Sequence, residues 1–339
     1  MEALLVEGQL PANLHGRFLQ SVPHPAHGTD PVSITGVRLA GGTATWHRAR
    51  TDLSLLGTVP TLAPAVRDGL RVARPAQDPR TGEWHTIATR PGSPLAEHVT
   101  MSAASAVRRG RCFVLSGPAR IDTVALTADH VVVLDLSVEH DRATELIGLR
   151  APYTWRPGKQ ARIGLLPRRS RGNPLWFPVS PCFVPEAVNA YEDGPEVVLD
   201  AVRHTSPTGP RELTRWTLDP STGTASEERL LSADSAVVAA PERGRRHHTV
   251  YAARDTAVSR HDPHTSTTYD FGPGHRLGQP ATAGDWLIVP FHDSTSSNLA
   301  VFDTADLTSG PRSVVRLPVT VPVATRTTWQ PLLEPVRET

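Results

Sequence analysis

Histidine, cysteine and lysine side chains are among the groups in this sequence that could bind a metal ion or act as a nucleophile. The 339 residues include 15 histidines and 2 cysteines. Lys159 is the single lysine, so a Schiff-base mechanism could use only this residue, and its Pro-Gly-Lys turn favours a solvated loop position. Cys112 and Cys182 lie in unrelated strand-like segments without a CxxC or Cys/His spacing. We therefore expect two reduced core thiols.

The histidines do not show a spacing that predicts a metal site. His247 and His248 fall in a strand-like segment, where neighbouring side chains point to opposite faces. His261 and His264 occupy a turn, and His292 ends a strand-like run. We expect these histidines to be surface or turn residues.

Several common catalytic and binding motifs are absent. The sequence contains no GxSxG, GxxxxGK(S/T), GxGxxG or HExxH motif, and the glycines at 272–278 do not have the dinucleotide spacing. The basic cluster at 168–171 has no interleaved aromatic residues, and the formal net charge is only +1. Nucleic acid is therefore not an expected partner.

Strand-like runs dominate the elements that would have to position a site. β-branched or alternating segments separated by turns occur at 112–115, 131–138, 196–202, 213–218, 249–253, 286–291, 299–302 and 313–319. The turns at 78–82 and 219–223 both read Asp-Pro-x-Thr-Gly. Recurring units of strand, turn and strand predict an all-β propeller. The best helix candidate covers residues 63–72.

Length and composition are consistent with one globular unit. Hydrophobic residues make up 39% and charged residues 20%, and no linker divides the sequence, so we predict a single β-propeller domain over residues 1–339. The first residues lack the basic and apolar regions of a signal peptide, and no apolar run is long enough to span a membrane. We expect a cytoplasmic protein without membrane insertion, either a monomer or a weak homo-oligomer.

Six segments, in order along nearly the whole chain, carry a family resemblance. They are Val-Glu-Gly-Gln-Leu-Pro-Ala-Asn-Leu-His-Gly-Arg-Phe at 6–18, Pro-Tyr-Thr-Trp at 152–155, Ala-Arg-Ile-Gly-Leu-Leu-Pro-Arg at 161–168, Asn-Ala-Tyr-Glu at 189–192, Leu-Thr-Arg-Trp-Thr-Leu-Asp at 213–219, and the closing segment 317–329. Together they resemble the carotenoid cleavage oxygenase family, which includes the lignostilbene dioxygenases and the retinoid isomerases. The resemblance implies a seven-bladed β-propeller whose axis carries Fe(II) held by four histidines, beneath a dome that forms a tunnel for an apolar, conjugated substrate.

The four iron-ligand positions implied by the resemblance are not histidine in this chain. They are Arg74, Asp122, Glu186 and Arg326, and Gln279 replaces the glutamate of the family's Gly-Glu-Pro motif. Arginine offers only hydrogen-bond donors and stays protonated, so this set cannot reproduce a cage of four imidazoles. We predict no bound metal and no cofactor. The formal charges of the four side chains cancel, and we expect them to form one hydrogen-bonded ion network on the axis.

These replacements suggest a function without iron. Asp122 or Glu186 would act as general acid or base, and Arg74 and Arg326 would orient the carboxylates or bind a substrate oxygen. The expected reaction is redox-neutral isomerisation, cyclisation or elimination on an apolar polyene, terpenoid or polyketide-like molecule. Two alternatives stay open: a pseudoenzyme or small-molecule-binding propeller with an inert ion network, and an oxygenase with rearranged metal ligands.

Further candidates surround this predicted site. Tyr191 and Trp329 match the family motifs and are candidate substrate contacts, although such residues also pack in cores. His85 closely follows the first motif and is a candidate proton shuttle. The chain is shorter than the family's usual members, which implies a reduced loop and helix dome. Residues 54–70 and 232–246 are the candidates for lining or covering the cavity.

Overall fold

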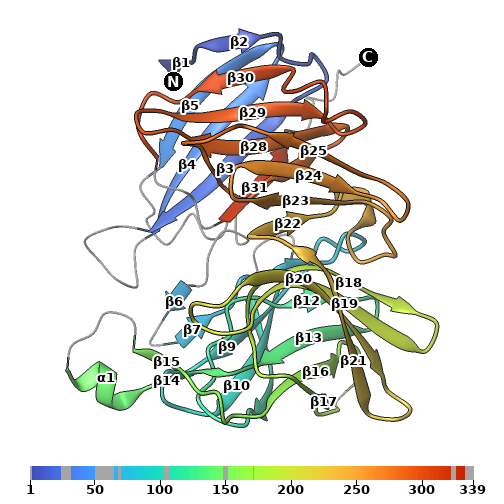
Figure 1. Cartoon of the computed structure of the whole chain (residues 1–339). Helices are drawn as coiled ribbons and strands as arrows, with labels where there is room; N and C mark the ends of the chain where they lie inside the picture. Colours follow the sequence, from blue (N-terminus) through green and yellow to red (C-terminus); the bar gives the residue numbers. More distant parts are fainter. Residues whose placement is uncertain are drawn as a thin grey trace, which may run out of the picture.

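The computed structural model describes residues 2–23, 32–49, 65–67, 70–102, 107–147, 152–170, 172–321 and 326–332. These residues are mostly β-strands grouped in sheets around a centre (Figure 1). Their helical segments are α1 (Arg142–Leu146) and the 3-10 helix η2 (Ala240–Glu242). The predicted all-β propeller is therefore confirmed.

Three sheets are formed mainly by the earlier strands of the chain, and one strand from near the end of the sequence joins the first of them. The first has the order β1-β5-β4-β3-β31, with β1 (Glu2–Ala3), β3 (Gly16–Pro23), β4 (Val32–Ala40), β5 (Thr43–Ala49) and β31 (Arg326–Pro331). The second has the order β11-β10-β9-β7-β6, with β6 (Ala65–Arg67), β7 (Leu70–Val72), β9 (Trp84–Thr89), β10 (Leu95–Met101) and β11 (Val107–Val114), and β8 (Ala76–Gln77) also pairs with β9. The third has the order β12-β13-β16-β17, with β12 (Ala125–Leu126), β13 (His130–Asp135), β16 (Ala161–Pro167) and β17 (Leu175–Val179). A two-stranded sheet of β14 (Val138–His140) and β15 (Tyr153–Trp155) is inserted between β13 and β16.

Three more sheets follow. The fourth has the order β18-β19-β20-β21, with β18 (Phe183–Asp193), β19 (Glu196–His204), β20 (Arg211–Asp219) and β21 (Thr224–Ser232). The fifth has the order β22-β23-β24-β25, with β22 (Ser235–Val237), β23 (Val250–Arg254), β24 (Ala257–His261) and β25 (Ser266–Asp270). The sixth has the order β2-β30-β29-β28-β26, with β2 (Val6–Gly8), β26 (Arg276–Leu277), β28 (Trp286–His292), β29 (Ser297–Asp303) and β30 (Ser313–Arg316), and β27 (Ala281–Ala283) also pairs with β28. The seven blades implied by the resemblance stay a prediction, because the described residues form six sheets of four or more strands and one of two.

Each sheet packs between its neighbours because its middle strands are apolar on both faces. In the fourth sheet, Val197, Leu199 and Ala201 join a buried cluster with residues of the third sheet. Val202 and Leu213 join a cluster with residues of the fifth. Side chains alternate between the two faces of a strand, so a shift of one residue in the strand pairing would turn the residues that contact the third sheet toward the fifth, and the reverse. Burial on both faces therefore fixes the pairing register.

Strands from distant parts of the sequence complete two neighbouring sheets. β2 pairs with β30 at one edge of the sixth sheet, and β31 pairs with β3 in the first. β31, drawn in red in Figure 1, lies toward the centre of the molecule. A strand from near the end of the sequence therefore supplies the inner edge of the sheet formed by the first strands.

The predicted helix at 63–72 is wrong. Its described residues form β6 and β7, which pair with each other, and β7 pairs with β9. A short apolar run does not distinguish a helix from two short strands, and here the neighbouring sheet supplies the hydrogen-bond partners. No helix among the described residues has the length and apolar character needed to cross a membrane.

Two residues expected in loops or on the surface are instead buried. The Lys159 side chain is 9% exposed and lies 2.8 Å from Asp135 and 2.9 Å from Glu139. His292 is buried, and its Nδ1 lies 2.8 Å from the Ser297 hydroxyl. The prediction of solvated positions is wrong because distant carboxylate and hydroxyl partners let these polar groups enter the interior.

Both cysteines are free, as expected, but only Cys182 is in the core, and Cys112 is exposed on an outer strand. His247 and His248 lie outside the strands, in the segment between η2 and β23. The predicted strand position of these histidines is therefore wrong.

Candidate active site

A cavity of about 780 Å³ lies where the inner edges of the six large sheets meet. Its walls include residues 74–80, 123–128, 186–190, 236–237, 279–281 and 327–331, so every one of these sheets contributes its innermost strand or the turn beside it. This lining places the cavity on the propeller axis, where the sequence predicted the site.

Arg74 reaches this cavity from the turn before β8. Its backbone N–H donates to the Asp122 carbonyl at 2.9 Å, which ties the second sheet to the third. Its guanidinium lies 3.7 Å from Glu186 Oε1 and donates to the Thr327 carbonyl at 3.4 Å. The side chain thus spans from one sheet to two others.

Glu186 lies on β18 at an irregularity in the pairing of β18 with β19. Its carboxylate is 14% exposed, lines the cavity and accepts a hydrogen bond from Gln279 Nε2. Burial raises the pKa of Glu186, against the opposing effect of Arg74, Arg326 and Arg243. A raised pKa favours the protonated form of the carboxyl group, which is the form that a general acid needs.

Gln279 is held in one orientation by its neighbour. Its Oε1 accepts from the Thr327 backbone N–H at 2.8 Å, and its carbonyl accepts from the Thr327 hydroxyl at 2.9 Å. Because the amide oxygen is engaged, the amide nitrogen must face Glu186. Gln279 therefore positions one oxygen of the carboxylate.

Asp122 has a different environment from Glu186. It is 3% exposed, and its carboxylate accepts from Arg71 at 2.5 Å and from Arg120 at 2.7 Å. Burial alone would raise the pKa of Asp122, but Arg120, Arg71 and Arg326 outweigh it and hold the pKa at about 2. Both guanidiniums also lie over the Tyr153 ring, at 5.2 and 5.4 Å. Asp122 is a fixed anion that does not line the cavity.

Arg326 begins β31 and is 7% exposed. Its Nη2 donates to the Pro185 carbonyl at 2.6 Å, whereas its buried Nη1 has no hydrogen-bond partner among the described residues. Burial lowers the pKa of Arg326 to about 10, helped by Arg74 and opposed by Asp122 and Glu186. The guanidinium stays charged at neutral pH.

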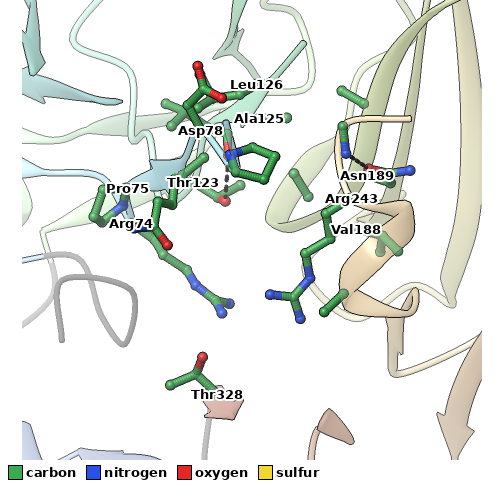
Figure 2. A pocket seen from close by; sticks show the side chains of 18 of the residues that line it. Arg74, Pro75, Asp78, Thr123, Ala125, Leu126, Val188, Asn189, Arg243 and Thr328 are labelled. Atoms are coloured by element: carbon green, nitrogen blue, oxygen red, sulfur yellow. Dashed lines mark hydrogen bonds between the residues drawn. The ribbon is translucent and has the colours of Figure 1, made fainter. Parts of the chain in front are cut away.

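Arg243 was not predicted from the sequence, although it lies in the segment 232–246 that was expected to cover the cavity. It follows η2, and Figure 2 shows its guanidinium and that of Arg74 pointing into the same space from opposite walls. Arg243 lines the cavity and is exposed to solvent there. Partial desolvation by the surrounding walls lowers its pKa, and Glu186 opposes this effect. No hydrogen bond or ion pair of its guanidinium is found within the part of the chain that the structure describes.

Asn189 fixes the segment that carries Arg243. Its Oδ1 accepts from the Gly244 N–H at 2.8 Å, and its Nδ2 lies 2.9 Å from the Arg245 carbonyl and 3.0 Å from His247 Nδ1. His247 Nε2 in turn lies 3.0 Å from Asp200. The Asn-Ala-Tyr-Glu motif thus positions a cavity residue through its asparagine.

The expectation that Arg74, Asp122, Glu186 and Arg326 form one ion network with each other is wrong. The structure brings all four to the axis, but Asp122 pairs with Arg71 and Arg120, which sequence reasoning missed. With Arg243 included, five guanidiniums face two carboxylates, so the axis carries a formal excess of three positive charges. Arg71 and Arg120 could not be found from the motifs, because the fold brings them to Asp122.

The three remaining candidates lie in different places. Trp329, on β31, lines the cavity. Tyr191 is 3% exposed, packs edge-on against His247 and is not among the residues lining the cavity. His85 is also absent from that lining; its Nδ1 lies 3.1 Å from His98 Nε2. Burial and Arg168 lower the pKa of His85 to about 4, so its ring is neutral at physiological pH.

The side chains on the axis do not fit Fe(II) held by imidazoles. Within the described ranges, no group of three or more histidine, cysteine, aspartate or glutamate side chains could hold a metal ion. The carboxylates are instead surrounded by guanidiniums, which have no lone pair to donate and repel a cation.

The ring of sheets and its axial cavity define this chain as a β-propeller protein with its candidate site on the axis. The model of the family described as Retinal pigment epithelial membrane protein (RPE65) matches residues 44–331, and the chain belongs to this family.

Curated relatives and solved structures agree with this assignment. The chain is 24% identical over 341 residues to a "Carotenoid cleavage oxygenase" of Mycobacterium tuberculosis (strain ATCC 25618 / H37Rv), covering 66% of this chain and 68% of the relative. It is 27% identical over 301 residues to "Carotenoid 9,10(9',10')-cleavage dioxygenase 1" of Arabidopsis thaliana, covering 74% and 56%. The solved structure of cobalt-substituted apocarotenoid oxygenase from Synechocystis has a TM-score of 0.81 at 19% identity, covering 96% of this chain and 95% of that one. A chimera of that oxygenase with RPE65 has a TM-score of 0.81 at 18% identity, covering 97% and 95%. These structural likenesses show the shared fold.

Proposed function

We propose that this protein catalyses metal-independent, redox-neutral acid–base chemistry on an apolar small molecule such as a polyene or terpenoid. The observation that carries the proposal is Glu186, a carboxyl group of raised pKa on the wall of the axial cavity. The relatives' names refer to carotenoids and apocarotenoids, which supports an apolar conjugated substrate for this chain.

The two axial carboxylates have environments suited to different roles. Asp122 stays ionised beside its arginines and holds their charges in place. Glu186 faces the cavity, where a substrate excludes water and further favours the protonated form of its carboxyl group. Glu186 would protonate one carbon of the substrate and the conjugate base would remove a proton from another carbon, which gives isomerisation or cyclisation without an oxidant. In an elimination, Glu186 would instead protonate a hydroxyl group that leaves as water, and the conjugate base would then remove a proton from the neighbouring carbon.

The geometry also bears on the two alternatives. If the ion network were inert, its side chains should not be accessible to a ligand. Asp122 does not line the cavity and meets this condition, whereas Arg74 and Glu186 line the open cavity. An oxygenase with rearranged ligands needs a donor set that the described residues on the axis do not supply. Enzyme chemistry at Glu186 is therefore the function that the cavity supports best.

Solvent deuterium tests the proposal directly. Purified protein is incubated in D₂O with a panel of retinoids and β-apocarotenals, with a chelator present and O₂ removed. The expected products are isomers or elimination products that carry solvent deuterium, detected by mass spectrometry. Glu186→Gln should reduce their formation by about 10² to 10⁴-fold. The matched control Glu228→Gln alters an exposed carboxylate on an outer strand and should leave the rate unchanged.

Two results would overturn the proposal. The first is cleavage to shorter aldehydes that requires O₂ and added iron. The second is undiminished deuterium incorporation by folded Glu186→Gln protein. Metal analysis of protein expressed with iron supplied adds a separate check, since about one iron per chain would return the protein to oxidative chemistry.

A further inference from the structure

The guanidiniums of Arg74 and Arg243 face the same part of the cavity, and Glu186 is a carboxylate close to both. The Arg74 side chain is 17% exposed; its guanidinium has one long ion-pair contact of 3.7 Å with Glu186 and one long hydrogen bond of 3.4 Å to the Thr327 carbonyl. Arg243, on the opposite wall, makes no hydrogen bond or ion pair that the described residues account for, and Figure 2 shows both groups converging. Arg243 is exposed to solvent, so water screens the repulsion between the two guanidiniums, and an anion bound between them would replace this water with charge-assisted hydrogen bonds.

The rest of the site does not supply that anion. Gln279 holds one oxygen of Glu186, and Glu186 cannot neutralise both Arg74 and Arg243. Asp122 is engaged by Arg71 and Arg120 outside the cavity lining. The buried Nη1 of Arg326, which has no partner among the described residues, is a further sign of unmatched positive charge near Glu186. Asp78, the other carboxylate of the cavity lining, is paired with Arg168, so a complementary negative charge would come from a ligand.

We propose that the axial cavity selects apolar substrates that carry a carboxylate, and that Arg74 and Arg243 bind this carboxylate from opposite sides. The inference rests on the proposed function and narrows its substrate class from apolar molecules to apolar carboxylic acids. Each carboxylate oxygen can accept from one guanidinium in a charge-assisted hydrogen bond.

Charge balance at this part of the wall favours a monoanion. Within the cavity lining, Arg74 and Arg243 face one carboxylate, Glu186, which leaves a single positive charge for the ligand to neutralise; Arg326 is outside that lining and donates to the Pro185 carbonyl. A diphosphate would bring two or three negative charges beside Glu186. Apolar side chains that could contact an apolar body also contribute to the cavity walls, among them Val124, Leu126, Val188, Val237, Pro280 and Trp329.

The binding test uses ligands that differ only in their head group. Retinoic acid, retinal and retinol share one apolar body, and Trp84 and Trp329 in the cavity wall provide a fluorescence signal. We expect retinoic acid to bind roughly 30-fold more tightly than retinol at neutral pH, which corresponds to about 2 kcal/mol. Added salt should weaken binding of the acid much more than binding of the alcohol.

Matched variants assign the preference to the two arginines. Arg243→Gln and Arg74→Gln should each reduce the preference for the acid to a few fold, while retinol affinity stays nearly constant. Arg246→Gln alters an exposed arginine of the same segment, which pairs with Asp193, and should keep the wild-type preference. Circular dichroism and thermal unfolding confirm that each variant is folded.

The outcomes separate this inference from the proposed function. Equal affinity for acid and alcohol in the wild-type protein, or an acid preference that survives in both cavity variants, would refute the carboxylate site even if Glu186 is needed for turnover. Tighter binding of geranylgeranyl diphosphate than of retinoic acid would refute the monoanion assignment. A preference for the acid that the two variants remove supports the site, whatever the deuterium experiment shows about Glu186.

Discussion

Replacing Asp122 tests whether this residue is a structural anion rather than a proton donor. The pKa of Asp122 is about 2 in the folded protein, against an ordinary value of 3.8. The difference corresponds to about 2.5 kcal/mol of stability at neutral pH. In Asp122→Asn, Arg71 and Arg120 also lose a buried partner. We therefore expect the free energy of unfolding at pH 7 to fall by about 2.5 to 5 kcal/mol.

The pH dependence of this loss follows from the sign of the shift. A carboxyl group with a lowered pKa stabilises the fold fully above its unfolded-state pKa, and this stabilisation disappears as the pH falls from about 4 to about 2. The stability difference between wild type and Asp122→Asn should shrink by about 1 kcal/mol between pH 7 and pH 3. Urea unfolding followed by tryptophan fluorescence at both pH values measures it.

The control and the refuting results are specific. Asp255→Asn changes a carboxylate that is 78% exposed and should alter stability by less than about 0.5 kcal/mol. If Asp122→Asn is as stable as wild type at pH 7, or if its deficit is the same at pH 3, the ion pairs with Arg71 and Arg120 do not stabilise the fold as inferred.

Two further predictions concern the cavity. The Asn189→Ala variant should lose the hydrogen bonds that hold the segment carrying Arg243. We expect its affinity for retinoic acid to fall about tenfold with little change for retinol, and its free energy of unfolding to fall by about 2 kcal/mol. Unchanged retinoic acid affinity in fluorescence titrations would show that Asn189 does not position Arg243. Binding of retinoic acid at neutral pH should take up protons. A second carboxylate near Glu186 raises the pKa of Glu186 against Arg74, Arg243 and Arg326. Calorimetric titrations in buffers of different ionisation enthalpy should detect this proton uptake in the wild-type protein. If the Glu186→Gln variant takes up the same number of protons on binding, a group other than Glu186 is responsible.

The strands were predictable from the sequence because their signal is local. Segments such as 213–218 and 286–291 alternate or run continuously with apolar residues, and they form β20 and β28. The helix predicted at 63–72 failed because its apolar spacing is compatible with either structure and the outcome depended on pairing with β9.

The axial residues were only partly predictable. Motif positions placed Arg74, Glu186 and Arg326 on the axis, and the structure brings them together there. The motifs carried no information on Arg71 or Arg243, because neither residue has a counterpart in the matched segments and both reach the axis through tertiary structure. The expected neutral balance of charge was wrong for the same reason.

The pairing of β31 with β3 has a consequence for how the protein is made. β31 contributes Arg326, Thr327 and Trp329 to the axial region, yet it is synthesised long after the strands with which it pairs. During translation the earlier sheets can form one after another, but the cavity has no complete wall until β31 has left the ribosome. Ligand binding then stabilises only chains that have finished this step. The axial site can therefore bind its ligand only after β31 has paired with β3, and a chain interrupted before β31 gains no stability from its ligand.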